Sequence, residues 1–134
     1  MGNLIDTCIF IAHERLHLDV RSLVESFTGQ DCLLSVITAS ELLHGIHRAK
    51  KPEVRARREG FVESVLRELT LVDVDLAIAR VHARVGAELE EQGKPIGLHD
   101  LWLAATCLAK GHTIITTNIR EFARVPGLSY KIWP

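Results

Sequence analysis

The sequence lacks several features that would place it in a protein class at once. Its net charge is only −1 at pH 7, whereas a general nucleic-acid binder is usually strongly basic. No apolar run approaches the ~20 residues of a membrane-spanning helix, and the first residues carry no signal-peptide pattern. The three cysteines include no Cys-x-x-Cys pair, and each lies in an apolar run, where a small buried thiol is expected. These absences predict a cytoplasmic protein.

Linker-like shifts of composition, internal repeats and low-complexity tracts are also missing. The 134 residues are 47% hydrophobic and 25% charged, which is ordinary for a soluble globular protein. A chain of this length can bury a substantial core within one domain. We therefore expect a single domain over residues 1–134.

Short apolar runs alternate with helical patterns along the chain. Strands are expected at residues 2–5, 32–36, 70–72, 113–116 and 130–132. Helices are expected near residues 19–27, 39–50, 53–68, 76–92 and 101–110. Strands separated by helices imply parallel pairing through right-handed crossovers, with helices on both faces. The predicted fold is α/β, a three-layer α/β/α sandwich around a central, mostly parallel sheet.

Three carboxylates stand where apolar, strand-like runs give way to helices. Asp6 closes the first run, Glu41 follows the run at residues 33–37, and Asp100 opens the alanine-rich helix. Because the carboxyl ends of parallel strands converge on one crevice, we expect these side chains to meet there. Carboxylates in one pocket repel one another unless a cation neutralises them. Such hard oxygen ligands suit Mg²⁺ or Mn²⁺, whose usual work in hydrolases is phosphoryl chemistry.

Each acid also has a structural explanation. Asp6, at a strand–helix junction, is a natural N-cap, and Asp100 could offset a helix dipole. Residues 38–41 (Thr-Ala-Ser-Glu) spell a capping box, which would put Glu41 in the first turn of its helix. A fourth acid, Glu121, projects from a short helix or is plain surface charge. Four strand-end acids together are less expected from capping alone, which favours a metal site.

Four segments, in this order along the chain, resemble the PIN-domain ribonucleases. They are residues 4–7 (Leu-Ile-Asp-Thr), 38–45 (Thr-Ala-Ser-Glu-Leu-Leu-His-Gly), 96–105 (Ile-Gly-Leu-His-Asp-Leu-Trp-Leu-Ala-Ala) and 117–128 (Thr-Asn-Ile-Arg-Glu-Phe-Ala-Arg-Val-Pro-Gly-Leu). The resemblance spans essentially the whole chain and is strongest to the VapC-type toxins of toxin–antitoxin pairs. The closing Arg-x-Pro-Gly-Leu followed by Trp133 is typical of that group.

The resemblance implies roles for individual residues. The catalytic acids of the family correspond to Asp6, Glu41, Asp100 and, as a more variable fourth, Glu121. The first three would bind the metal, whereas the longer arm of Glu121 could leave it to act through water. The supporting polar residues correspond to Thr7, Thr117 and Asn118. Cys8 stands where such toxins commonly have Asn or Ser, which could alter a hydrogen bond at the site.

The resemblance also implies an activity and partners. The chain would be a Mg²⁺- or Mn²⁺-dependent endoribonuclease, the toxin of a type II toxin–antitoxin system, cutting RNA to leave a 3′-hydroxyl and a 5′-phosphate. A cognate antitoxin protein would control it, and it would be a homodimer. Residues that could hold flanking RNA phosphates are Arg48, Lys50, Lys51, Arg120 and Arg124. For the basic run at 48–58, a solvated helix face is the alternative. His44 and His99 adjoin the acids and could also touch RNA.

The helices expected over residues 39–68 combine an apolar face with basic residues. The apolar members are Leu42, Leu43, Ile46, Phe61, Val65 and Leu66. Such a face could bind an amphipathic antitoxin segment, or it could fill the core. An antitoxin arginine could then reach the acids and compete with Mg²⁺.

Other functions stay open on the sequence alone. The chain could be a catalytically weak PIN module that binds RNA or protein. It could be a metal-dependent phosphatase with Asp6 as covalent nucleophile, although an enzyme of the haloacid-dehalogenase type would carry Asp at position 8, where this chain has cysteine. The pairs His13/His17 and His44/His47 have helical spacings that suit zinc, but no acid or cysteine set accompanies them at finger spacing.

Overall fold

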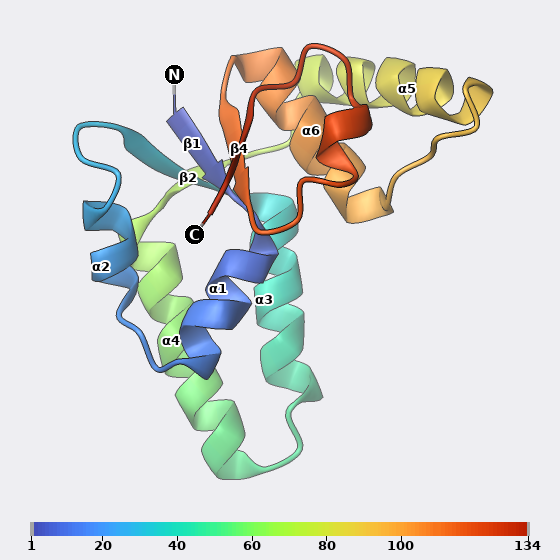
Figure 1. Cartoon of the computed structure of the whole chain (residues 1–134). Helices are drawn as coiled ribbons and strands as arrows, with labels where there is room; N and C mark the ends of the chain where they lie inside the picture. Colours follow the sequence, from blue (N-terminus) through green and yellow to red (C-terminus); the bar gives the residue numbers. More distant parts are fainter. Residues whose placement is uncertain (1, 134) are drawn as a thin grey trace.

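A five-stranded parallel sheet lies at the centre of the computed structural model, which describes residues 2–133 (Figure 1). The strands are β1 (Gly2–Ile5), β2 (Asp31–Ser35), β3 (Thr70–Val72), β4 (Thr113–Thr116) and β5 (Tyr130–Ile132). Their order across the sheet is β3-β2-β1-β4-β5, and every neighbouring pair is parallel. The helices are α1 (Thr7–Arg15), α2 (Val20–Glu25), α3 (Val36–Arg48), α4 (Pro52–Glu68), α5 (Leu76–Glu91), α6 (Leu98–Lys110) and the short 3₁₀ helix η1 (Phe122–Arg124). The predicted α/β fold is confirmed.

Successive residues of the inner strands enter two separate hydrophobic cores, because side chains alternate across a sheet. In β1, Ile5 belongs to one core and Leu4 to the other, and β2 and β4 divide in the same way. The first core is completed by buried residues of α1, α2, α3 and α4, and the second by those of α5 and α6. Figure 1 shows α1 to α4 on one side of the sheet and α5 with α6 on the other. This arrangement is the predicted three-layer sandwich.

Some helix positions differ from the prediction. The sequence indicates a helix start at Asp6 but gives no bounds for α1, whose nine residues are too few to show a clear helical period. Helix α3 begins at Val36 and not at residue 39, because Ser35 is its N-cap and accepts a hydrogen bond on Oγ from the Ile37 amide at 3.1 Å. Val36 and Ile37 are β-branched, so their side chains resemble a continuing strand. Helix α6 likewise begins at Leu98, three residues before the predicted start.

Two of the three cysteines are buried, as predicted. Burial, with a smaller contribution from the charge of Asp31, raises the pKa of Cys32 to about 11, and burial raises the pKa of Cys107 to about 12. Cys8 is only half-buried, at the start of α1, so its prediction as a core thiol is wrong. None of the helices within residues 2–133 has both the length and the apolar character needed to cross a membrane.

Candidate active site

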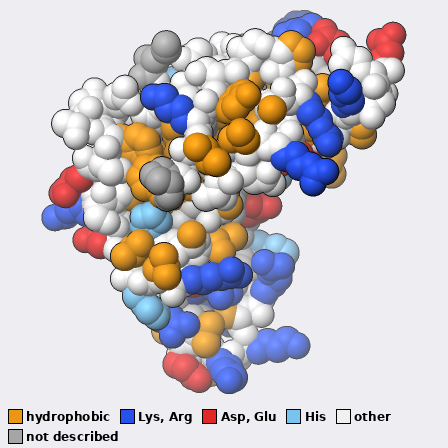
Figure 2. Space-filling model, viewed as in Figure 1, with side chains coloured by type: hydrophobic (Ala, Val, Ile, Leu, Met, Phe, Trp, Pro, Cys, Tyr) orange, Lys and Arg blue, Asp and Glu red, His pale blue; other side chains and the backbone are white. Residues whose placement is uncertain are grey.

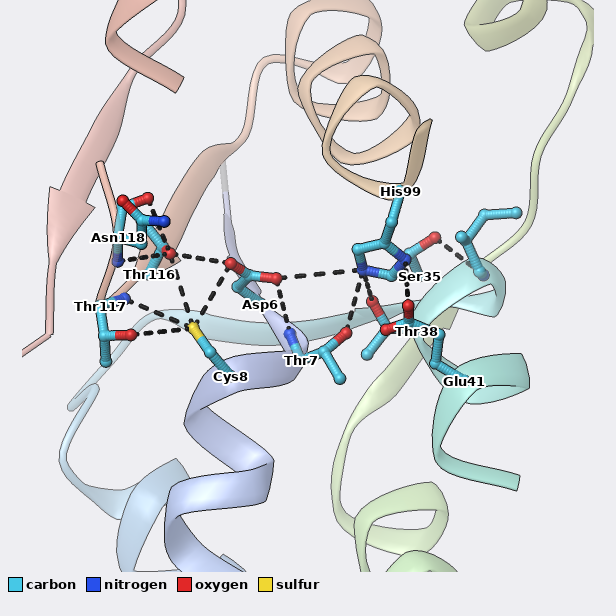
Figure 3. A network of polar contacts seen from close by, with 11 residues as sticks. Asp6, Thr7, Cys8, Ser35, Thr38, Glu41, His99, Thr116, Thr117 and Asn118 are labelled. Carbon is cyan, nitrogen blue, oxygen red and sulfur yellow. Dashed lines mark hydrogen bonds and ion pairs between the residues drawn. The ribbon is translucent and has the colours of Figure 1, made fainter. Parts of the chain in front are cut away.

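Asp6 lies directly after the central strand β1 and is 7% exposed. Its Oδ1 accepts a hydrogen bond from the Thr7 amide at 2.8 Å, so Asp6 is the N-cap of α1. Its Oδ2 accepts hydrogen bonds from Thr116 Oγ1 at 2.8 Å and from Cys8 Sγ at 3.4 Å (Figure 3). The two explanations offered for Asp6 are therefore compatible, because one oxygen begins the helix while the other joins a polar network at the strand ends.

Thr116, the last residue of β4, belongs to this network although the sequence did not indicate it. Its hydroxyl is buried, donates to Asp6, and accepts a hydrogen bond from the Asn118 amide at 3.1 Å. Strands β1 and β4 pair in parallel with Ile5 opposite Ile115, so the next residues along the chain, Asp6 and Thr116, are neighbours. The contact joins positions 110 apart in the chain, and no local pattern reveals such a pairing.

Cys8 connects Asp6 to the loop after β4. Its Sγ accepts hydrogen bonds from the Thr117 amide at 3.5 Å and from Thr117 Oγ1 at 3.2 Å. Asn118 Oδ1 accepts a hydrogen bond from the Arg120 amide at 3.1 Å, which stabilises the turn that follows. Thr117 and Asn118 therefore act on Asp6 indirectly, through Cys8 and Thr116.

Glu41 lies in the second turn of α3, because the helix begins at Val36 after the Ser35 cap. The predicted capping box over residues 38–41 is therefore wrong, and so is the placement of Glu41 in the first turn. The Glu41 side chain is 48% exposed, and its Oε1 lies 3.5 Å from His99 Nδ1. Since the helix cap does not use this carboxylate, it is available to a ligand.

His99 occupies the space between Asp6 and Glu41 (Figure 3). Its Nε2 lies 2.9 Å from Thr7 Oγ1, 3.4 Å from Thr38 Oγ1 and 3.9 Å from Asp6 Oδ1. The ring thereby joins the first turn of α6 to the first turns of α1 and α3. The sequence suggested that His99 touches RNA, but both of its nitrogens face protein groups.

The carboxyl groups of Asp100 and Glu121 shift each other's pKa in opposite directions. Burial first, then a hydrogen bond to Glu121 and the charges of the other acids, raise the pKa of Asp100 to about 8. The same hydrogen bond, received from Asp100, lowers the pKa of Glu121, with further help from the Gly97 amide, which donates to Oε2 at 3.3 Å. At neutral pH, Asp100 therefore holds the proton and Glu121 carries the negative charge.

Asp100 lacks a compensating positive charge among the described residues that shift its pKa. The raised pKa of Asp100 reflects this lack, because burial and the charges of Asp6, Glu121 and Glu41 all disfavour its ionised form. A divalent cation would reverse that balance, and carboxylate oxygens are the donors that Mg²⁺ and Mn²⁺ prefer. Within residues 2–133, no three His, Cys, Asp or Glu side chains are placed so that together they could hold a metal ion as they stand. The chemistry of the donor set nevertheless fits such a cation.

The basic residues predicted to hold RNA phosphates differ in their surroundings. All five are exposed to solvent: Arg48, Lys50, Lys51, Arg120 and Arg124. Arg124 in addition donates from Nη1 to the Pro95 carbonyl at 3.0 Å, which fixes the segment that leads into α6. Arg124 therefore has a structural contact that competes with binding of a phosphate.

The apolar face predicted over residues 39–68 mostly fills the core. Leu42, Ile46 and Val65 are buried, and Leu43, Phe61 and Leu66 are half-buried against the same core. None of the six is exposed, which favours the alternative that this face fills the core. Only the half-buried three could contribute to a partner surface.

The histidine pairs considered for zinc do not form a ligand set. His13 is buried, with Nδ1 3.1 Å from the Ile9 carbonyl oxygen, and its ring centroid lies 6.4 Å from that of Trp133. His17 lies exposed beyond α1 with a φ of 54°. Neither pair belongs to a group of three or more suitable ligands in the part of the chain that the structure describes.

Comparison with known proteins agrees with this geometry. The PIN domain family matches residues 4–128. Ribonuclease VapC1 of Rickettsia felis is 34% identical over 128 residues, covering 96% of this chain and 93% of that protein. The tRNA(fMet)-specific endonuclease VapC of Shigella flexneri is 33% identical over 132 residues, with 97% and 96% covered. The crystal structure of VapBC2 from Rickettsia felis, bound to a DNA fragment from their promoter, matches with a TM-score of 0.89 at 26% identity over the whole of both chains. The chain belongs to the PIN-domain family, among its VapC-type members.

Proposed function

We propose that this chain is a metal-dependent endoribonuclease, the toxin of a type II toxin–antitoxin system. The observation that carries the proposal is the group of carboxylates at the strand ends, where Asp100 stays protonated because it is buried among other acids. Such a group suits a hard divalent cation, Mg²⁺ or Mn²⁺. The relatives named as VapC ribonucleases, at about a third identity over nearly the whole chain, support RNA as the substrate.

The residues of the site would have different roles in phosphodiester hydrolysis. A divalent cation bound by Asp6, Glu41 and Asp100 would neutralise phosphate charge and activate water. Asp6 is kept in one orientation by the Thr7 amide and the Thr116 hydroxyl. Asp100 must release its proton to take part, and Glu121, ionised beside it, can accept a hydrogen bond from the attacking water.

The remaining parts of the proposal concern products, assembly and control. Hydrolysis leaves a 3′-hydroxyl and a 5′-phosphate. The chain acts as one PIN-like domain over residues 1–134, in the cytoplasm and as a homodimer. Solved structures of VapBC pairs resemble it over its full length, which supports control by a cognate antitoxin.

Cleavage of RNA by the purified protein tests the proposal. We expect the wild-type chain to cut RNA with added Mg²⁺ or Mn²⁺ and to be inactive in excess EDTA. Asp6→Asn should be inactive with metal, because it removes a charge while keeping an oxygen able to cap α1. Undiminished cleavage in EDTA, or full activity of Asp6→Asn, contradicts the metal mechanism.

Two further assays separate this function from its rivals. A phosphatase would hydrolyse a small phosphate monoester and would depend on Asp6 as a nucleophile. A catalytically weak PIN module would bind RNA without cutting it under any metal condition. We expect no monoester hydrolysis, and RNA binding accompanied by cleavage.

A further inference from the structure

A groove of about 570 Å³ opens beside Glu41, between helices α1, α3 and α4. We call it the three-helix groove. Its charged and histidine lining residues are Glu14, Arg15, His17, Glu41, His44, Arg48, Arg57 and Arg58, and the others are Thr7, Ile11, Leu42, Gly45 and Val62. In Figure 2, Lys, Arg and His side chains gather over the lower part of the molecule, where Figure 1 draws these three helices. The groove therefore joins an acidic end at the candidate active site to a basic end.

Some of the arginines near the groove already have partners in the protein. Arg58 Nε lies 3.0 Å from Glu14 Oε1, and Arg58 Nη1 donates to the Gly45 carbonyl at 3.0 Å. Arg55 donates to the Ile46 and His47 carbonyls at 3.2 Å and 2.9 Å, at the end of α3. These contacts tie α4 to α1 and α3. They also use the carboxylate of Glu14, which otherwise would neutralise part of the groove.

Three other arginines have no ion-pair or hydrogen-bond partner for their guanidinium groups within residues 2–133. Arg15, Arg48 and Arg57 come from α1, α3 and α4 respectively, are exposed, and line the groove. Among the ion pairs and side-chain hydrogen bonds found within residues 2–133, none involves their guanidinium groups. Three unpaired guanidinium groups around one concavity create a site for an anion, and the planar fork of arginine suits phosphate in particular.

The lining also indicates what kind of ligand fits. Leu42 and Val62 are 6% and 1% exposed, so their apolar surface is buried in the core. Ile11, at 39%, is the most exposed aliphatic side chain of the lining. An apolar helix would find few anchors here, whereas a polyanionic strand would find several cations. A volume of this size is typical of small-ligand sites, so the groove has room for a nucleotide-sized segment of a strand.

The two ends of the groove lie on the same helix, so a single strand could contact both of them. Glu41 and Arg48 both lie on α3, seven residues apart, which corresponds to about 10 Å along the helix axis. We propose that Arg15, Arg48 and Arg57 form a subsite that binds a phosphate of single-stranded RNA next to the phosphodiester that is cut. This inference rests on the proposed ribonuclease function, since it assumes that the cleaved phosphate lies at the acids.

Binding of RNA by alanine variants tests the subsite. The probe is a fluorescein-labelled, mixed-sequence single-stranded oligoribonucleotide, and its fluorescence anisotropy is followed in an Asp6→Asn background so that it is not cut. Arg15→Ala, Arg48→Ala and Arg57→Ala should each weaken binding about tenfold, the scale of one hydrogen bond to a charged group. Each should also lower the slope of log K against log salt by about 0.7, as expected for one lost contact with a single strand.

Matched variants separate a specific subsite from a general loss of charge. Arg80→Ala removes the same charge from an exposed position on α5, outside the groove, and should leave affinity within about twofold, as for a solvent-screened charge. Arg48→Lys keeps the charge but not the fork and should be intermediate. Equal effects of Arg80→Ala and the groove variants overturn the proposal. So does unchanged RNA binding by the groove variants combined with weaker binding of the antitoxin, which would assign the groove to the protein partner.

Cleavage of the same RNA by the wild-type protein with Mg²⁺ is measured in parallel, so the two proposals can fail separately. If the wild-type protein cleaves RNA but all three groove variants bind RNA as tightly as before, the ribonuclease proposal stands and the subsite proposal is overturned. If the groove variants bind RNA more weakly but the wild-type protein does not cleave it, the phosphate site in the groove stands and the ribonuclease proposal is overturned.

Discussion

The acids of the site differ in how firmly the protein holds them. Asp6 accepts hydrogen bonds from the Thr7 amide, Thr116 Oγ1 and Cys8 Sγ, so its orientation is fixed before any ligand arrives. Glu41 is half exposed and has only His99 nearby among its close charged partners within residues 2–133. Asp100 is neutral at pH 7 and is paired with Glu121. We infer that Asp6 defines the position of a cation, while Glu41 and Asp100 adjust to it.

Removing the charge of any of these acids should reduce cleavage without unfolding the protein. We expect Asp6→Asn, Glu41→Gln and Asp100→Asn each to lower the rate of RNA cleavage by at least about 10–100-fold, the scale seen when even the supporting groups of metal sites are lost. Melting temperatures at neutral pH should stay close to the wild-type value, because Asp6→Asn and Glu41→Gln relieve repulsion among the acids and Asp100→Asn replaces a group that is already neutral. Cleavage rates and thermal melts of the same preparations check both parts. A variant that is folded and fully active would remove its residue from the site.

The raised pKa of Asp100 should make the metal-free protein less stable as pH rises. The pKa of Asp100 is raised from 3.8 to about 8 in the folded state, so between these values the native state binds a proton that the unfolded state has lost. The stabilisation is therefore present at low pH and is lost as pH rises toward 8. The lowered pKa of Glu121 acts in the opposite sense, but only in the acid range around its ordinary value.

Urea unfolding in EDTA between pH 5 and pH 8 measures this effect, since the window lies between the two pKa values of Asp100. We expect a decline in the free energy of unfolding that is much smaller in Asp100→Asn. Mg²⁺ should remove the decline as well, because a cation takes the place of the proton. A decline of equal size in Asp100→Asn would show that other groups cause it.

At the scale of elements, the site forms because strand ends and helix starts coincide. Asp6 follows β1 and caps α1, Ser35 ends β2 and caps α3, and Thr116 ends β4. Since β2, β1 and β4 are adjacent and parallel, their carboxyl ends bring these positions to one edge of the sheet. Helix α6 adds His99 and Asp100 from its first turn. Short connections at this edge therefore cap helices and also bring together the residues of the candidate active site.

A comparison of Ser35→Ala with Glu41→Gln separates these two purposes. Ser35 is buried and accepts the Ile37 amide hydrogen bond at the start of α3, so Ser35→Ala should cost about 1 kcal/mol of stability while cleavage by the folded protein continues. Glu41→Gln should leave stability within about 0.5 kcal/mol, as for a surface substitution, and abolish most activity. Urea unfolding and RNA cleavage are measured on both. A destabilised but active Glu41→Gln would restore a structural role for Glu41.

At the scale of the whole molecule, the fold follows from features that are local in sequence. Four of the five strands lie at their predicted residues, because short β-branched runs between helical segments give a clear signal. The start of α3 was misplaced because Val36 and Ile37 resemble strand residues, and this error produced the wrong capping box at Glu41. Thr116 and His99 could not be assigned their roles, because they reach Asp6 and Thr7 across 110 and 92 positions of the chain. The acids themselves were recognisable, since each stands beside a predicted strand or helix boundary.

The last prediction concerns control by the antitoxin. A positively charged antitoxin side chain that reaches the acids would compete with the cation for the same carboxylates, and such charge competition links the two binding equilibria reciprocally. We therefore expect the affinity of the cognate antitoxin to fall as Mg²⁺ rises at constant ionic strength. Asp100→Asn should weaken antitoxin binding and reduce this dependence, whereas Arg80→Ala, on the exposed surface of α5, should change neither. Titration calorimetry over a Mg²⁺ series measures both effects. An affinity that is independent of Mg²⁺ would place the antitoxin contact away from the acids, so that inhibition would have to arise from blocking RNA elsewhere on the molecule.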